Sequence, residues 1–158
     1  MAAVATLALA EPVMTVIHRF LFHGPLWCEH RSHHAHPTAR RLVRNDMLWL
    51  WPLAGAAALL VWGWPALRGV GIGSAAYVGA YVFAHDGVAH GRFRVPRVVR
   101  RLAVFRGIAE THRLHHRHPA GAPPFGVYLT ALEYRWRLTV RYSPPPKTCG
   151  PASAARSS

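Results

Sequence analysis

Residues 47–67, MLWLWPLAGAAALLVWGWPAL, contain no charged side chain. A helix needs about 20 predominantly apolar residues to cross the hydrocarbon core of a bilayer, so this stretch predicts a membrane span. Tryptophans lie near both of its ends, as is typical of the membrane–water interface. A second uncharged run, residues 69–84, follows Arg68. It predicts a return span over about residues 69–85, so that the two spans form a helical hairpin.

The N-terminal residues are apolar up to His18, apart from Glu11. They predict a first span over about residues 2–22, with the core helix of a soluble protein as the alternative for this segment. Because a carboxylate is costly in lipid, Glu11 is expected to face the protein interior or a metal site.

Small residues in the return span repeat every four positions, at Gly71, Ala75 and Gly79. This pattern predicts close helix packing along one face. The expected fold class is therefore all-α, an integral membrane helical bundle. Residues 1–142 are expected to form its membrane-embedded domain, and residues 143–158 have the composition of a disordered tail.

The chain carries a formal net charge of +13, with 19 basic and 6 acidic side chains. Arginines gather on both outer flanks of the predicted hairpin, within residues 31–44 and 92–106, whereas the loop between the spans has only Arg68. Positive loops stay on the cytoplasmic side, so a multi-pass protein of the bacterial cytoplasmic membrane is expected. Lipid contact is a further role expected of these arginines, and attraction of an acidic partner is the alternative. The charge alone would suit a nucleic-acid-binding protein, but a charge-free span argues against that class.

Ten of the twelve histidines fall into four motifs, in the order H-x4-H, H-x2-H-H, H-x4-H and H-x2-H-H. The same two motifs therefore occur before and after the predicted hairpin. Neutral imidazole is the commonest metal ligand and suits iron, zinc and copper. Ten ligands exceed what one ion accepts, so two metal ions with about four to five imidazoles each are expected, on the cytoplasmic side. The candidate ligands are His18, His23, His30, His33, His34, His85, His90, His112, His115 and His116.

The spacing within these motifs has a geometric meaning on a helix. Positions i, i+3 and i+4 lie on one face, so each H-x2-H-H motif predicts three imidazoles that point to a common centre. Positions five apart differ by about 140°, so both members of an H-x4-H motif reach one centre only near a helix end or across a metal pair. Gly24-Pro25 after the first pair and Gly87 inside the second would permit such an end.

Four carboxylates are expected to accept hydrogen bonds from imidazole N–H groups. They are Glu11, Glu29, Asp86 and Glu110. They are too few to build the Glu-rich site of soluble di-iron bundles. His36 and His118 stand outside the motifs, next to prolines, and are expected to be solvated. A single histidine is commonly a core or interfacial residue, but four motifs in repeated order favour a metal site.

Five segments together resemble the membrane fatty acid hydroxylase and sterol desaturase superfamily, and in detail its bacterial β-carotene hydroxylases. They are HRFLFHGPLW (residues 18–27), HRSHH (30–34) followed by Asn45-Asp46, AHDGVAHGRF (84–93), THRLHH (111–116) and Pro124-Phe125-Gly126. The similarity covers roughly residues 11–128, and the HDGxxH segment with Arg92-Phe93 is its most specific part.

The resemblance implies an all-helical membrane protein that binds two iron ions through the ten histidines. It implies hydroxylation at C3 of the β-ionone rings, from β-carotene through β-cryptoxanthin to zeaxanthin. The carotenoid substrate would come from the bilayer, with O2 as co-substrate and electrons from a ferredoxin-type donor. Two departures stand out: such proteins usually have a longer apolar segment before the first histidine motif, and often an acidic residue where this chain has Ala35-His36-Pro37.

Two other functions compete with this interpretation. A fatty acyl or sterol hydroxylase or desaturase would keep the fold and change the substrate. A non-catalytic membrane protein that binds or transports metal would need no O2 chemistry. Transport requires ligands along a path across the bilayer, whereas the motifs here gather on one predicted side.

Overall fold

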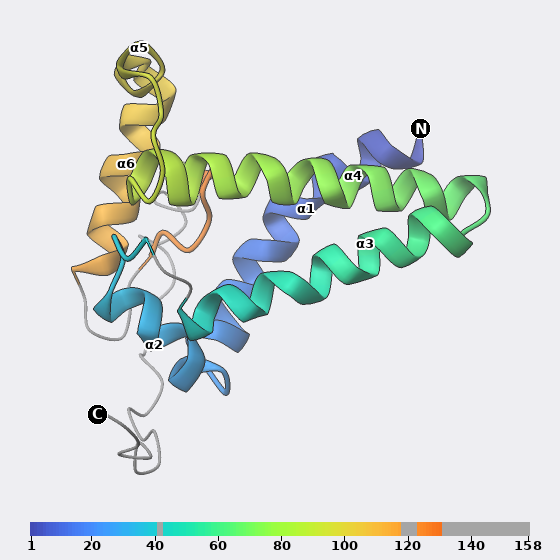
Figure 1. Cartoon of the computed structure of the whole chain (residues 1–158), viewed down its shortest axis with the longest axis horizontal. Helices are drawn as coiled ribbons and strands as arrows, with labels where there is room; N and C mark the ends of the chain where they lie inside the picture. Colours follow the sequence, from blue (N-terminus) through green and yellow to red (C-terminus); the bar gives the residue numbers. More distant parts are fainter. Residues whose placement is uncertain (41–42, 118–122, 131–158) are drawn as a thin grey trace.

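A computed structural model describes residues 1–40, 43–117 and 123–130 of the chain. Its described elements are helical, and no strand occurs among these residues (Figure 1). In chain order they are α1 (Ala2–Ile17), η1 (His18–Phe22), α2 (Trp27–Ala35), η2 (Arg44–Trp49), α3 (Leu50–Trp62), α4 (Pro65–Val82), η3 (Phe83–Ala89), α5 (Arg97–Arg101) and α6 (Ala103–His116). Of the η elements, η1 and η3 are π-helical and η2 is a 3-10 helix. The all-α class expected from the sequence is confirmed for the described residues.

Three apolar helices form an elongated arm. Helix α4 packs against both α1 and α3, and the N-terminus lies near the α3–α4 turn, far from the histidines (Figure 1). The hairpin turn falls at Gly63 and Trp64, not at Arg68 as predicted. Proline causes the shift: Pro65 is the first residue of α4, where its missing N–H is harmless, and it holds the preceding residue in an extended conformation.

Close packing of α4 depends on Gly71, which belongs to the predicted series, and on Gly73, which does not. A Cβ atom on Gly73 would lie 2.5 Å from the carbonyl oxygen of Ala3 in α1, and one on Gly71 would lie 2.9 Å from that of Ala56 in α3. Gly79 is exposed, and a Cβ there would meet nothing within 4 Å. The predicted close packing is therefore confirmed at Gly71 and wrong at Gly79, because α4 is held between two helices and each needs its own small residues.

Among the described helices, the continuous α1–η1 segment, Ala2–Phe22, is long and apolar enough to cross a membrane. The predicted span over residues 47–67 is divided into η2, the 13-residue α3 and the start of α4. Large apolar side chains on the arm remain exposed, including Trp51 at 79% and Trp62 at 82%. Whether α3 and α4 cross the bilayer stays a prediction.

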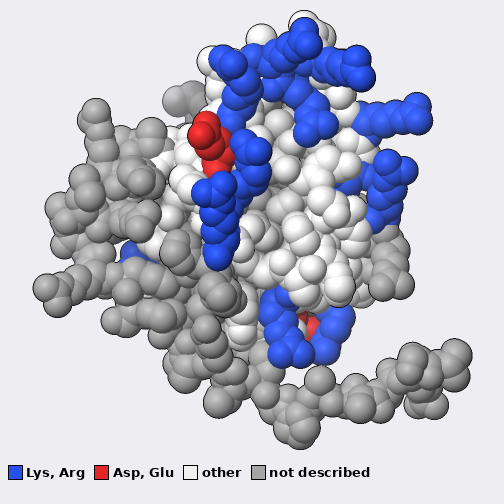
Figure 2. All heavy atoms as spheres, turned by 90° about the vertical axis from the view of Figure 1, so that its left-hand side faces the viewer, with Lys and Arg blue, Asp and Glu red and all other residues white. Residues whose placement is uncertain are grey.

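The other end of the molecule is a compact head made by α2, η3, α6 and the end of η1 (Figure 1). Where the arm meets the head, the rings of Trp49 and Tyr81 pack at a centroid distance of 4.4 Å, with Ile108 and Val127 in the same buried cluster. Exposed arginines gather on the face of the head that looks away from the arm, along its upper, right-hand and lower parts (Figure 2). The arm therefore ends in a basic head, and the turn at its far end is followed by Arg68.

Candidate metal centre

Both H-x4-H pairs lie on π-helical turns at the ends of long helices. The amide of His23 donates to the carbonyl of His18 at 3.0 Å, and the amide of His90 donates to that of His85 at 3.0 Å. These i→i+5 bonds place residues five apart about one turn apart, so both imidazoles of a pair face the same side. The prediction that the pairs need a helix end is confirmed, since each second histidine terminates its π-helical turn.

Glycines next to these turns are required by space. A Cβ atom on Gly24 would collide with the carbonyl oxygen of Phe20 in the preceding turn. A Cβ atom on Gly87 would lie 2.5 Å from the ring of Phe93. Gly24 thus allows the chain to leave the helix after His23, and Gly87 leaves room for the Phe93 ring beside the second pair.

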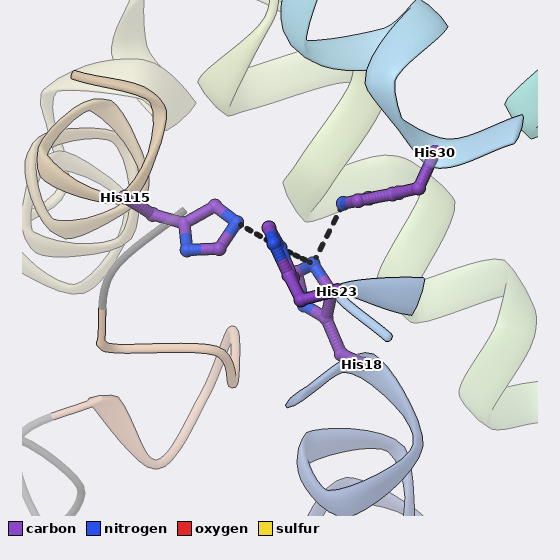
Figure 3. A group of neighbouring side chains, drawn as sticks. All are labelled: His18, His23, His30 and His115. Atoms are coloured by element: carbon purple, nitrogen blue, oxygen red, sulfur yellow. Dashed lines mark hydrogen bonds between the residues drawn. The ribbon is translucent and has the colours of Figure 1, made fainter. Parts of the chain in front are cut away.

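Four imidazoles from three segments form the first group, named here group 1: His18, His23, His30 and His115 (Figure 3). Their ligand atoms all lie within 4.8 Å of one another, and all four side chains are buried. The Nε2 atom of His18 is 3.0 Å from that of His30, and the Nε2 atom of His23 is 3.1 Å from that of His115. His34 adjoins this group, with its Nε2 atom 3.2 Å from that of His30.

Group 2 comprises His33, His90, His112 and His116, again with ligand atoms within 4.8 Å of one another. The Nε2 atom of His33 is 3.1 Å from those of both His90 and His116, and the Nε2 atoms of His90 and His112 are 2.7 Å apart. His85 adjoins this group through ring contacts with His33 and His112, at centroid distances of 4.7 and 4.4 Å. All ten predicted ligands are thus brought together around two centres.

Each H-x2-H-H motif divides its histidines between the two groups. His30 and His34 lie at group 1 while His33 lies in group 2, and in α6 His112 and His116 lie in group 2 while His115 lies in group 1. The prediction of one common centre per motif is therefore wrong. Positions i and i+4 differ by about 40° on a helix, but i+3 lies about 100° from i+4, so the middle histidine faces the other centre.

Hydrogen bonds at Nδ1 show why group 1 suits a cation. His18 Nδ1 lies 2.6 Å from the carbonyl oxygen of Phe125, and His30 Nδ1 lies 2.6 Å from Oδ1 of Asn45. Both acceptors require a proton on Nδ1, so in the neutral rings both Nε2 atoms carry lone pairs. Those lone pairs face each other across 3.0 Å with no proton to share. A metal ion between them removes this repulsion, so the donor set fits a metal.

Burial holds several of these rings in the neutral form that metal ligation requires. Burial, with the neighbouring imidazoles, lowers the pKa of His30, His33 and His112 well below the usual histidine value. The same causes lower the pKa of His34 to about 2, and burial with the nearby His85 and His18 lowers that of His116 to about 3. Without a metal, these five rings therefore stay unprotonated at neutral pH.

Of the four predicted carboxylate acceptors, Asp86 is the one with a contact to an imidazole in the described structure: its Oδ1 lies 2.9 Å from His85 Nδ1. Glu29 instead pairs with Arg44 at 2.5 Å, and Glu110 is exposed on α6. Glu11 faces the protein interior, as expected, but its hydrogen bonds do not go to an imidazole. It is buried, and it accepts hydrogen bonds from backbone amides of residues 127–129 and from the hydroxyl of Tyr77.

Two acceptors were missed by the sequence analysis: the Asn45 side chain and the Phe125 carbonyl. Neither has a spacing rule that links it to the histidine it contacts, since Asn45 is 15 residues from His30 and Phe125 is 107 residues from His18. Glu11 contributes indirectly, because its bonds to residues 127–129 hold the segment that carries the Phe125 carbonyl. The Asn45-Asp46 pair after the HRSHH segment was the available signal for the first of them.

The two groups meet at His34 and His116, whose rings stack at a centroid distance of 4.2 Å. A hollow of about 570 Å³ borders both rings and is lined also by Trp27, Arg31 and Arg44. His36 borders the same hollow and is exposed, as expected of a histidine outside the motifs. His118 lies outside the described residues. The paired centre is therefore bordered by a hollow on the side of α2.

Comparison with known proteins gives matches over most of the chain. Residues 3–136 match the fatty acid hydroxylase family. A β-carotene hydroxylase of Paracoccus sp. (strain PC1) is 36% identical over 118 residues, which cover 72% of this chain and 71% of that protein. The chloroplastic β-carotene hydroxylase 1 of Capsicum annuum is 35% identical over 123 residues, 73% of this chain but 38% of the plant protein. The matched region is thus well under half of the plant relative's length. No solved structure matches the chain.

Proposed function

The chain belongs to the fatty acid hydroxylase family, and on that premise we propose that it is a carotenoid hydroxylase with two non-heme iron ions. The proposed reaction adds a hydroxyl group at C3 of the β-ionone rings, converting β-carotene to β-cryptoxanthin and then to zeaxanthin. The observation that carries the proposal is the convergence of ten imidazoles on two adjacent centres. Relatives named β-carotene hydroxylase support the choice of substrate.

Group 1 with His34 would hold one iron, and group 2 with His85 would hold the other. Iron held by neutral imidazoles supplies O2-dependent oxidation, which an unactivated C–H bond requires. The protein's own part is to keep the rings neutral and oriented. The Phe125 carbonyl, Asn45 and Asp86 fix the Nδ1 protons of three histidines, and burial of the rings excludes bulk water.

The arm and the head give this reaction two different surroundings. Exposed apolar side chains on α1, α3 and α4 suit contact with lipid, from which a carotenoid would approach. The basic face of the head suits the cytoplasmic side of a multi-pass protein in the bacterial cytoplasmic membrane (Figure 2). The same face would attract a ferredoxin-type electron donor, because such a partner is acidic.

Hydroxylation or desaturation of a fatty acyl or sterol lipid is the second candidate. It is favoured by the name of the matched family, fatty acid hydroxylase. It uses the same paired centre and differs only in the lipid that enters. A non-catalytic metal-binding protein is a third candidate, and it predicts bound metal without consumption of O2.

The test is expression of the chain in a bacterium that accumulates β-carotene, followed by pigment chromatography. We expect β-cryptoxanthin and zeaxanthin from the wild-type chain and none from His33→Ala at equal expression. His36→Ala is the matched control, since its exposed side chain lies outside both groups, and it should keep full conversion. An iron-loaded wild-type chain that leaves β-carotene unchanged, or a His33→Ala variant as active as wild type, would contradict the proposal. A hydroxylated or desaturated fatty acyl or sterol lipid in such cells would establish the second candidate.

A further inference from the structure

We propose that Arg92 is a positioning residue that ties together the acceptors of the two histidine groups. This inference rests on the proposed function, because it concerns how the same paired centre is held. Arg92 follows the second H-x4-H pair by two residues, and its side chain donates hydrogen bonds to Asp46 and to the carbonyl of Ala39. It would act through Asp46 and Asp86.

The contact between Arg92 and Asp46 is a two-pronged ion pair. Nη1 of Arg92 donates to Oδ1 of Asp46 at 2.7 Å, and Nη2 donates to Oδ2 at 2.6 Å. Both side chains are largely buried, with 11% and 10% of their surface exposed. The Nε atom of Arg92 also donates to the carbonyl of Ala39 at 2.8 Å, so the guanidinium joins the segment that follows α2 to Asp46 in η2. Such parallel bonds are among the strongest in proteins.

Asp46 connects Arg92 to group 1 through hydrogen bonds. Its Oδ2 accepts the amide of Val43 at 2.9 Å, which fixes the first turn of η2. The preceding residue, Asn45, is buried in that turn, and its backbone N–H donates to the hydroxyl of Ser32 at 3.1 Å. Asn45 is thereby held where its side chain accepts the Nδ1 proton of His30. Arg92 therefore anchors the turn that orients a group 1 ligand.

Asp86 connects Arg92 to His85, which adjoins group 2. Its Oδ1 accepts the Nδ1 proton of His85 and lies 3.6 Å from Nη1 of Arg92. The backbone amide of Arg92 also donates to the carbonyl of Asp86 at 2.9 Å, so both the side chain and the main chain of Arg92 hold this residue. One guanidinium thus serves the acceptor of His85 and the turn that carries the acceptor of His30.

Lysine should not replace arginine here. A single ammonium cannot form two parallel bonds to Asp46 while it also reaches Ala39 and Asp86, because its donors radiate from one atom. Arg92→Lys keeps the positive charge but removes the planar guanidinium. This variant therefore distinguishes an effect of hydrogen-bond geometry from an effect of charge. Arg94→Gln is the matched control, since Arg94 is exposed, two residues away.

The test is titration of the metal-free full chain in detergent with Co2+, followed by visible absorption, for wild type and variants. We expect two binding steps in wild type. Asp86→Asn should weaken one step and Asn45→Ala the other, whereas Arg92→Gln should weaken both. Removing such supporting partners typically costs about 10–100-fold in metal affinity. Arg92→Lys should also weaken both steps and change the cobalt spectrum, while Arg94→Gln should match wild type.

The inference is overturned if Arg92→Gln binds both ions as wild type does, or if one step alone weakens. If Arg92→Gln does not fold, Arg92→Lys decides: wild-type affinity at either step overturns the inference. Wild-type protein that binds fewer than two ions would instead contradict the proposed function. The two failures are therefore distinguishable in one series of titrations.

Discussion

At the scale of single residues, the proton on Nδ1 decides what each imidazole can do. A neutral ring has one N–H, so an acceptor at Nδ1 leaves Nε2 as a lone pair. His18, His30 and His85 obtain this acceptor from a backbone carbonyl, an amide and a carboxylate. Carboxylates were the acceptors that the sequence suggested, because charge is visible in a sequence and a carbonyl contributed by a distant segment is not.

Acid should destabilise the metal-free protein through the same rings. His34 and His116 have pKa values near 2 and 3 in the folded chain, lowered mainly by burial, against about 6.5 in the unfolded chain. Below pH 6.5 these two imidazoles bind protons in the unfolded chain but remain neutral in the folded chain. The free energy of unfolding therefore falls as pH falls. Each such ring contributes about 1.4 kcal/mol per pH unit over the interval between its two pKa values.

Denaturant unfolding of the metal-free chain at pH 7.5, 6.5 and 5.5 measures this effect. Stability should change little between the two higher values and fall clearly by pH 5.5. Saturation with metal should protect the fold, because a bound ion competes with protons for the same nitrogens. A metal-free chain of equal stability at pH 5.5 and 7.5 would show that these rings are not held neutral by burial.

At the scale of elements, the sequence predicted the apolar helical segments, but neither their interruptions nor the short helices η2 and α5. The arm, the hairpin and the four histidine motifs could all be predicted, because apolar runs and ligand spacings are local properties. The position of the turn at Gly63 and Trp64 and the division of each H-x2-H-H motif could not. The division depends on which centre lies on each side of α2 and α6, and that is set only when the helices meet.

Packing of α4 on α1 predicts opposite effects for two glycines of the same helix. Gly73→Ala would place a Cβ atom 2.5 Å from Ala3 O and 2.8 Å from Thr6 Cβ, so the helices must separate. Overpacking of this kind typically costs about 1–3 kcal/mol. Gly79→Ala meets nothing within 4 Å and should stabilise the helix by about 0.5–1 kcal/mol.

Thermal unfolding of the two variants in the same detergent is the measurement. The predicted order of stability is Gly79→Ala above wild type and wild type above Gly73→Ala. If both substitutions shift the midpoint equally, the contact between α1 and α4 is not as close as described.

At the scale of the whole molecule, an apolar arm carries a basic head that contains the two histidine groups (Figures 1 and 2). The exposed tryptophans of the arm and the arginines of the head would place the histidines at the cytoplasmic surface. In this arrangement an apolar substrate would reach the centre from the lipid, and a soluble electron donor would reach it from the cytoplasm. On this proposal the basic charge of the chain sets its orientation in the membrane.

Cysteine labelling of intact cells tests this orientation. Trp64→Cys places a thiol at the α3–α4 turn, and Val98→Cys places one in α5, where the native side chain is 70% exposed. A membrane-impermeant maleimide should label Trp64→Cys in intact cells and Val98→Cys only after lysis. The unsubstituted chain, labelled in parallel, corrects for the native cysteines. The reverse pattern would mean that the head faces outward.

The central claim is that ten imidazoles hold two metal ions. The most direct measurement is the number of iron ions per chain, by elemental analysis of protein purified from iron-supplemented cells. We expect two per chain, falling to one or fewer in both His33→Ala and His115→Ala. His33→Ala removes a ligand of group 2, and His115→Ala removes a ligand of group 1. A wild-type chain with one iron or none, or two irons retained in both variants, would contradict the central claim.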